Sequence, residues 1–150
     1  AGAGHGARPG CRRRGSVLRL VVCCGHRLPR PEAPLGHDEA GLAAAWGAAV
    51  SSPLVVVGLE PGGQSSQTPA VACDGYRPVF NHEVGFHVSD SPLHILTFEV
   101  RDAPTGRPMA RRAVALDAVR EGFRWLPLHS RSGTTIPHSG LLVFVQFVAE

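Results

Sequence analysis

The side chains that could do chemistry in this 150-residue chain are eight histidines, four cysteines and twelve carboxylates. Their spacing does not form a catalytic set. His82 and His87 are five residues apart in one expected strand, so their side chains should point to opposite faces. The cysteines form no C-x-x-C pair, and no Gly-x-Ser-x-Gly turn is present to carry a serine nucleophile. The sequence therefore predicts free thiols and no catalytic site within this chain.

The positive and negative charges are divided unevenly along the chain. Residues 1–30 carry seven arginines and no acid, whereas residues 31–150 carry eight arginines against twelve acids, a net charge of −4. Because the body is acidic and no aromatic side chains interleave with the basic ones, we expect no nucleic-acid partner. Residues 1–15, rich in Gly, Ala and Arg, are predicted to be a basic linker, and residues 16–150 to be one domain.

Short apolar or alternating runs, separated by Gly, Pro, Ser and Asp, predict strands along most of this domain. In residues 93–101, for example, Leu96, Phe98 and Val100 alternate with polar residues and should share one face. Eight such runs occur, at residues 17–24, 53–59, 67–73, 80–88, 93–101, 110–116, 124–128 and 141–148. A turn is expected at 62–66, and a turn or one helical turn at 117–121.

The predicted fold class is therefore all-β, an eight-stranded antiparallel β-sandwich with Greek-key connections. Residues 30–52 form a long insertion between the first two strands. Its Ala-rich part, residues 40–50, is a candidate short helix with Asp38 as a candidate N-cap.

Four segments, in this order, together resemble the C2 domain that follows the catalytic barrel in phosphoinositide-specific phospholipases C. Residues 18–29 (LRLVVCCGHRLP) are similar to the opening strand of that domain and its Gly-x-x-Leu-Pro exit. Residues 74–81 (DGYRPVFN) are similar to its Asn-Gly-Phe-x-Pro-x-Trp-Asn turn, with Phe80 in place of the usual Trp. Residues 93–102 resemble a middle strand, and residues 122–128 with 141–147 resemble the closing strands.

The resemblance implies a calcium site in those members of the family that bind calcium, formed by carboxylates from loops at one end. Calcium takes about six to eight oxygen ligands. Asp102 matches the first acidic position of the third loop, but Pro104 stands at the next one and the loop continues to a cation, Arg107. Ser52 replaces a further expected acid. Asp102 is thus the one candidate calcium ligand, and we expect no required cofactor and calcium-independent binding.

Membrane contact does not depend on calcium, and two residues are candidates for it. Trp46, among Ala and Val in the insertion, and Arg107 should lie at the same end as Asp102. Trp favours the membrane interface, and Arg is attracted to anionic headgroups. The alternatives for residues 42–50 are a helix packed on the sandwich or a disordered insertion.

Taken together, the resemblance implies a non-catalytic C2 domain of a phosphoinositide-specific phospholipase C. Such a domain would pack on the catalytic barrel of the parent enzyme and orient it on anionic phospholipid at the cytoplasmic face of membranes. The parent would hydrolyse phosphatidylinositol 4,5-bisphosphate to diacylglycerol and inositol trisphosphate. Two alternatives remain: a calcium-independent protein-interaction module of a catalytically inactive relative, and an unrelated secreted sandwich.

Overall fold

The computed structural model describes residues 16–32, 51–72, 74–89 and 93–149, and these residues form eight strands and one short 3₁₀ helix. The strands are β1 (Ser16–His26), β2 (Pro53–Glu60), β3 (Gln64–Gln67), β4 (Val79–Val88), β5 (Ile95–Asp102), β6 (Pro108–Ala115), β7 (Gly122–His129) and β8 (Thr135–Ala149). The 3₁₀ helix η1 (Leu116–Ala118) joins β6 to β7, in the region where one helical turn was expected. No helix in this part of the chain is long and apolar enough to cross a membrane.

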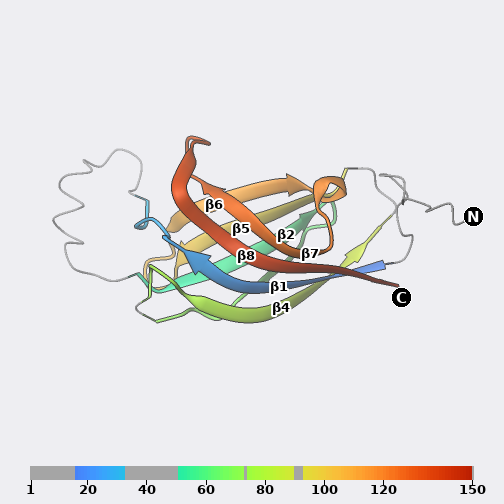
Figure 1. Ribbon diagram of the computed structural model, residues 1–150, viewed down its shortest axis with the longest axis horizontal. Helices are drawn as coiled ribbons and strands as arrows, with labels where there is room; N and C mark the ends of the chain where they lie inside the picture. The colour runs from blue at the N-terminus through green and yellow to red at the C-terminus, as the bar shows by residue number, and fades with distance from the viewer. Residues whose placement is uncertain (1–15, 33–50, 73, 90–92, 150) are drawn as a thin grey trace, which may run out of the picture.

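The strands form two layers of four, as Figure 1 shows. One layer has the order β3-β2-β5-β6 and the other the order β7-β8-β1-β4, and all neighbouring strands are antiparallel. The layers are joined at one corner by a single residue pair between β6 and β7, Arg111 with His129. β1 pairs with β4 and β8, which are distant in sequence, as in a Greek key. The predicted all-β antiparallel sandwich is confirmed.

The core lies between the two layers and follows the alternation of the sequence. Leu18, Leu20 and Val22 on β1 are fully buried, and they belong to one cluster with Leu96, Phe98 and Val100 on β5, which are at most 1% exposed. Burying each such side chain contributes about 1.5–3 kcal/mol, so the apolar inner face is what holds the layers together. Phe80 is half-buried and packs against this core.

The third strand was predicted in the wrong place. The chain reverses at residues 61–63, where Gly62 and Gly63 have positive φ angles of 115° and 64°, and β3 is Gln64–Gln67. Residues 67–73 were expected to be this strand, but the ladder with β2 ends at Gln67. Thr68 is buried directly afterwards, and its Oγ1 accepts the backbone N–H of Val55 at 3.0 Å. The two glycines therefore set the turn earlier than the apolar run suggested. The candidate helix at 40–50 lies outside the described residues.

Candidate functional site

The described parts of four connections lie at one end of the sandwich, here called the loop end, which is on the left in Figure 1. They are the β1–β2, β3–β4, β5–β6 and β7–β8 connections, which share an end because successive strands run in opposite directions. Backbone hydrogen bonds tie them together. The N–H of Gly25 donates to the carbonyl of Pro78 at 2.9 Å, and that of Glu32 to the carbonyl of Pro108 at 2.7 Å. Side chains from distant parts of the sequence are therefore held close together here.

Asp102, the candidate calcium ligand, is the last residue of β5 and is only 5% exposed. Its Oδ1 accepts the backbone N–H of Ser52 at 2.9 Å, and its Oδ2 accepts the hydroxyl of Thr105 at 2.7 Å. Its carbonyl oxygen accepts the N–H of Gly106 at 2.7 Å. Both carboxylate oxygens thus close the β5–β6 loop and join it to the start of β2.

Of the two candidate membrane-contact residues, the structure describes one. Arg107 lies in the β5–β6 loop at the loop end and is half-buried, and its carbonyl accepts the N–H of Asp102 at 2.9 Å. Trp46 lies outside the described residues. The structure therefore brings Arg107, Asp102 and Ser52 together and leaves the place of Trp46 a prediction.

The histidines do not gather in the described part of the chain. His82 is half-buried and His87 is exposed, as expected for opposite faces of β4. His94 is buried, with its Nε2 3.1 Å from both the hydroxyl and the carbonyl oxygen of Ser89. Among the described residues, no three His, Cys, Asp or Glu side chains lie together as potential metal ligands. Cys23 and Cys24 are free thiols, as predicted.

A cluster of aromatic and basic side chains lies at the loop end. The ring of His26, at the end of β1, is 5.7 Å from the ring of Tyr76 and 6.2 Å from that of Trp125. Tyr76 is 55% exposed and Trp125 is 47% exposed. We call His26, Arg27, Tyr76, Arg77 and Trp125 the aromatic–arginine edge. No sequence pattern indicated this edge, because three separate elements contribute and only strand register brings them together.

Both arginines of this edge lie beside Tyr76. The Nε of Arg27 donates to the hydroxyl of Tyr76 at 3.3 Å, and the Cζ of Arg77 is 6.0 Å from the ring centroid. The hydrogen bond from Arg27, then its charge and that of Arg77, hold the pKa of Tyr76 below its usual value. Asp74 fixes the turn, since its Oδ1 accepts the backbone N–H groups of Tyr76 at 3.2 Å and Arg77 at 2.9 Å. The edge is therefore electropositive.

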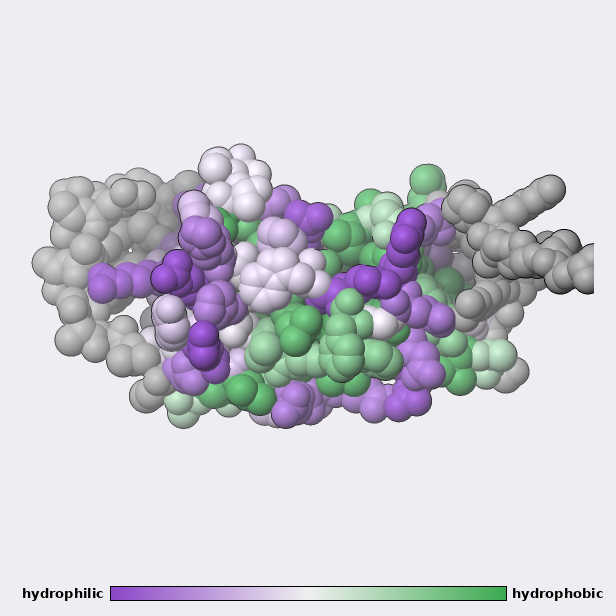
Figure 2. Space-filling view, viewed as in Figure 1, coloured by the Kyte–Doolittle hydropathy of each residue, from purple (hydrophilic) through white to green (hydrophobic). Residues whose placement is uncertain are grey.

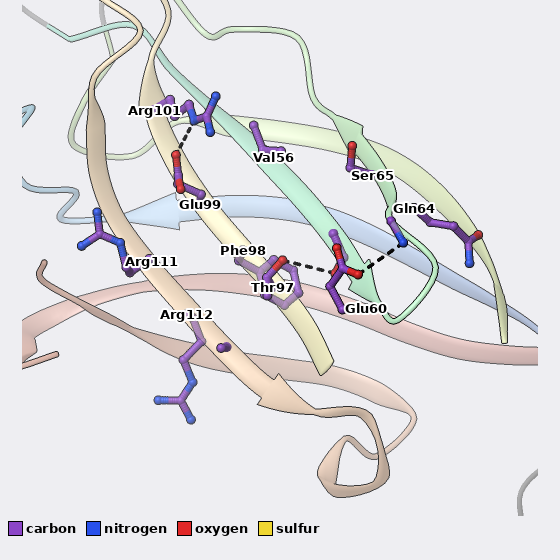
Figure 3. A pocket seen from close by; sticks show the side chains of 13 residues that line it. Val56, Glu60, Gln64, Ser65, Thr97, Phe98, Glu99, Arg101, Arg111 and Arg112 are labelled. Atoms are coloured by element: carbon purple, nitrogen blue, oxygen red, sulfur yellow. Dashed lines mark hydrogen bonds and ion pairs between the residues drawn. The ribbon is translucent and has the colours of Figure 1, made fainter. Parts of the chain in front are cut away.

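A hollow of about 490 Å³ lies on the outer face of the β3-β2-β5-β6 layer (Figure 3). Its lining includes Gly58, which has no side chain, and Ala113, whose side chain is one methyl group. The hydroxyl of Thr97 donates to the carbonyl of Gly58 at 3.4 Å, and Arg101 forms an ion pair with Glu99, as Figure 3 shows. Two further residues that line the hollow, Arg111 and Arg112, each have a buried guanidinium nitrogen without a hydrogen-bond partner among the described residues, Nη1 and Nε respectively.

The sequence and the fold match those of known proteins. The sequence profile of the C2 domain matches residues 16–116. This chain belongs to the C2 domain family. The C2 domain is 30% identical over 109 residues to 1-phosphatidylinositol 4,5-bisphosphate phosphodiesterase gamma plc-3 of Caenorhabditis elegans, which is 67% of this chain and 8% of that protein. It is 28% identical over 94 residues to the epsilon-1 phosphodiesterase of the same organism, covering 62% of this chain and 5% of that protein.

Solved structures share the fold of this C2 domain. A C2 domain of plant Extended Synaptotagmin 1 superposes with a TM-score of 0.64 at 21% identity, over 93% of this chain and 98% of that one. The crystal structure of S. officinalis PLC21 superposes with a TM-score of 0.68 at 14% identity, over 88% of this chain and 15% of that one. The expected resemblance to the C2 domains of phosphoinositide-specific phospholipases C is confirmed, and this C2 domain spans a small part of the enzymes it matches.

Proposed function

We propose that this C2 domain is a non-catalytic docking module of a phosphoinositide-specific phospholipase C. It packs on the catalytic barrel of the parent enzyme and orients that barrel on anionic phospholipid, without calcium, at the cytoplasmic face of membranes. The parent hydrolyses phosphatidylinositol 4,5-bisphosphate. The similarity to two phosphodiesterases named for that substrate, of which this domain matches 8% and 5%, supports the proposal.

The observation that carries the calcium-independent part is the use of the Asp102 carboxylate. Its two oxygens accept the N–H of Ser52 and the hydroxyl of Thr105. A calcium ion needs about six to eight oxygens, several of them from carboxylates, and residues 103–107 supply no other acid. A single carboxylate supplies at most two of these oxygens, and both oxygens of Asp102 already accept a hydrogen bond within the loop end.

Co-sedimentation with vesicles tests this proposal directly. The protein is mixed with phosphatidylcholine vesicles, with or without phosphatidylserine, in the presence of calcium or of EGTA. We expect binding to the anionic vesicles that is equal in calcium and in EGTA. Binding that requires calcium would overturn the calcium-independent part, and no binding to anionic vesicles in either buffer would overturn membrane docking.

The same assay tests Trp46 and Arg107 as membrane contacts. Trp46→Ala and Arg107→Gln should each weaken binding to anionic vesicles if their side chains enter the interface. Arg107→Gln keeps the backbone hydrogen bonds of residue 107, so the loop should remain closed. Unchanged sedimentation of both variants would remove these two residues from the membrane contact.

A second function is favoured by the outer face of the β7-β8-β1-β4 layer. Phe123 is 64% exposed, and its ring meets that of Phe144 edge-on with centroids 5.0 Å apart. Figure 2 shows hydrophobic residues gathered over the middle of this face. Exposed aromatic patches are typical of protein interfaces, which fits a protein-interaction module of a catalytically inactive phospholipase C-like protein. A hydrolysis assay of the full parent on phosphatidylinositol 4,5-bisphosphate separates the two functions, since the inactive relative would release no inositol trisphosphate.

A further inference from the structure

Cys23 and Cys24 are neighbours in the sequence, and a β-bulge in β1 turns their side chains toward the same face of the sheet. In a regular strand, adjacent side chains point to opposite faces. Here Val22 pairs with Val143 of β8, but Cys24 pairs with Leu142, so two residues of β1 lie opposite one residue of β8. The pairing of β1 with β4 shifts at the same place. Cys23 is the extra residue, and both thiols therefore lie on the face that carries Leu142.

Burial identifies this face as the outer one. Val22 and Val143 are at most 1% exposed and point into the core. Leu142, the residue before Val143, is half-buried, as expected for the opposite side of the sheet. Cys23 and Cys24 are both half-buried free thiols. A regular alternation would have buried one of the two, so their similar exposure fits a pair of thiols on the outer face.

The face that carries the two thiols is apolar. Leu142 and Phe144 of β8 lie on it, and their register partners on β7 are Trp125 and Phe123. Both partners are exposed aromatic residues. Figure 2 shows the hydrophobic residues gathered over the middle of this face. The thiols are therefore partly accessible, in surroundings that disfavour a charged group.

The thiol of Cys23 is held in its protonated form. Burial, and next the neighbouring Cys24, raise the pKa of Cys23 above its usual value, against a hydrogen bond from the backbone of Phe144. Its Sγ also donates to the carbonyl of Val21 at 3.7 Å. A metal cation binds thiolates, and a zinc ion usually takes four ligands. Within the described part of the chain, no three His, Cys, Asp or Glu side chains lie together. The pair therefore suits an electrophile that reacts with two neutral thiols better than it suits a metal cation.

We propose that Cys23 and Cys24 form a dithiol site for trivalent arsenic compounds. In the reaction with arsenous acid, two As–O bonds break and two As–S bonds form, and each thiol proton leaves with one hydroxyl group as water. Arsenic remains trivalent, so no oxidant or reductant takes part. The product is uncharged, which suits the apolar face, and both of its sulfur atoms come from one bulge. This site is independent of the membrane docking proposed above.

Binding of phenylarsine oxide to the 150-residue chain tests this site. The variant Cys11→Ser/Cys73→Ser removes the other two cysteines and is the background for all measurements. We expect one phenylarsenic group per chain by mass spectrometry, with both remaining thiols lost to a thiol-reactive dye and restored by an excess of a small dithiol. Cys23→Ala or Cys24→Ala in this background should weaken binding about 100-fold, because the second As–S bond then no longer forms within the same molecule.

The change in stability shows whether the folded bulge is the form that binds. Adjacent cysteines in an unfolded chain also bind an arsenical, and a ligand raises the midpoint of unfolding only if it prefers the folded state. We expect phenylarsine oxide to raise the urea midpoint of the background variant, measured by circular dichroism. The matched control is Val114→Cys/Ala115→Cys in a chain without Cys23 and Cys24. Val114 packs against the core and Ala115 is exposed in a regular part of β6, so these thiols face opposite ways and the midpoint should not rise.

Three results would each overturn the site. Alanine variants that bind as tightly as the background variant would show that single thiols account for the binding. A urea midpoint that falls with phenylarsine oxide would show that the two thiols meet only in the unfolded chain. An equal rise in the control on β6 would show that adjacency in the sequence suffices without the bulge. Circular dichroism checks the fold of each variant, and Cys23→Ser and Cys24→Ser replace an alanine variant that does not fold.

Discussion

The Oδ1 of Asp102 accepts the backbone N–H of Ser52, a residue fifty positions earlier in the chain, at 2.9 Å. In the opposite direction, the N–H of Ala103 donates to the carbonyl of Ser52 at 2.9 Å. Pro53, the first residue of β2, and Asp102, the last residue of β5, are register partners. These hydrogen bonds therefore extend the β2–β5 pairing by one residue beyond the strand ends. Asp102, which the family resemblance presents as a candidate metal ligand, thus also hydrogen-bonds the β5–β6 loop to the start of β2.

Asp102→Ala should therefore lower the free energy of unfolding by about 1–3 kcal/mol, because it leaves a partly buried N–H and a hydroxyl without their charged acceptor. Asp102→Asn should cost less, since its amide oxygen can still accept from Ser52. Urea unfolding followed by circular dichroism measures both values. A loss in Asp102→Ala below about 0.5 kcal/mol, no larger than for an ordinary surface substitution, would contradict the fastening role.

Glu32, in the β1–β2 connection, forms two ion pairs at the same end of the sandwich. Its side chain is 14% exposed, and its Oε2 accepts from Nη2 of Arg111 at 3.1 Å and from Nε of Arg131 at 3.0 Å. Glu32→Gln should reduce the free energy of unfolding by about 1 kcal/mol, since both arginines are partly exposed and water screens the loss. Arg131→Gln, which removes one exposed partner, should cost less. Urea unfolding at low and high salt measures the effect, and a loss that does not shrink in high salt would argue against an electrostatic cause.

The sequence predicted the inner face of the sandwich well, because burial there follows a simple period of two. The alternation that placed Leu96, Phe98 and Val100 on one face of β5 is what the structure shows. The alternation of apolar residues did not predict the ends of those strands whose boundaries are set by turns. The start of β8 at Thr135 lies ahead of the predicted start at residue 141, since Ile136 is the one aliphatic residue in 135–140. Pairing of residue 129 with residue 135 across the β7–β8 hairpin decides that boundary.

The loop end was predicted only in part, for a different physical reason. Asp102 and Arg107 could be placed there because both follow one apolar run directly. The aromatic–arginine edge could not, since His26, Tyr76 and Trp125 come from β1, the β3–β4 loop and β7. Their proximity depends on the register of β1 with β8 and of β8 with β7, in which residue 142 pairs with both residue 24 and residue 125. Register between strands distant in sequence is not encoded in any local pattern.

Gly140→Ala tests the close contact between the indole of Trp125 on β7 and Gly140 on β8. The added methyl group would overlap the indole and lie 2.8 Å from the carbonyl oxygen of Leu126, so we expect a loss of about 1–3 kcal/mol in the free energy of unfolding. Combining Gly140→Ala with Trp125→Ala should recover part of that loss, because one of the two overlaps is then gone. A double-mutant cycle by urea unfolding measures the coupling. Strictly additive losses would show that the ring and the glycine do not touch in solution.

The ion pair of Arg19 on β1 with Glu83 on β4 gives a pH-dependent prediction. The Nε of Arg19 is 2.7 Å from Oε1 of Glu83, and both side chains are about half exposed to water. The hydrogen bond from Arg19, and next its charge, lower the pKa of Glu83 below its usual value. A carboxyl group whose pKa is lower in the folded state adds stability above its unfolded-state pKa of about 4.3 and loses it as pH falls through the folded-state value.

Wild type should therefore be more stable than Glu83→Gln at pH 7, and this difference should shrink as pH falls below about 4. Carboxyl NMR titration should find the pKa of Glu83 below its usual value in wild type and nearer to it in Arg19→Gln, which removes the donor and the charge. High salt should move the wild-type value the same way, because exposed pairs are screened. If Glu83 titrates at the same pH in wild type and in Arg19→Gln, the ion pair does not persist in solution and β1 and β4 are held by their backbone ladder and core contacts alone.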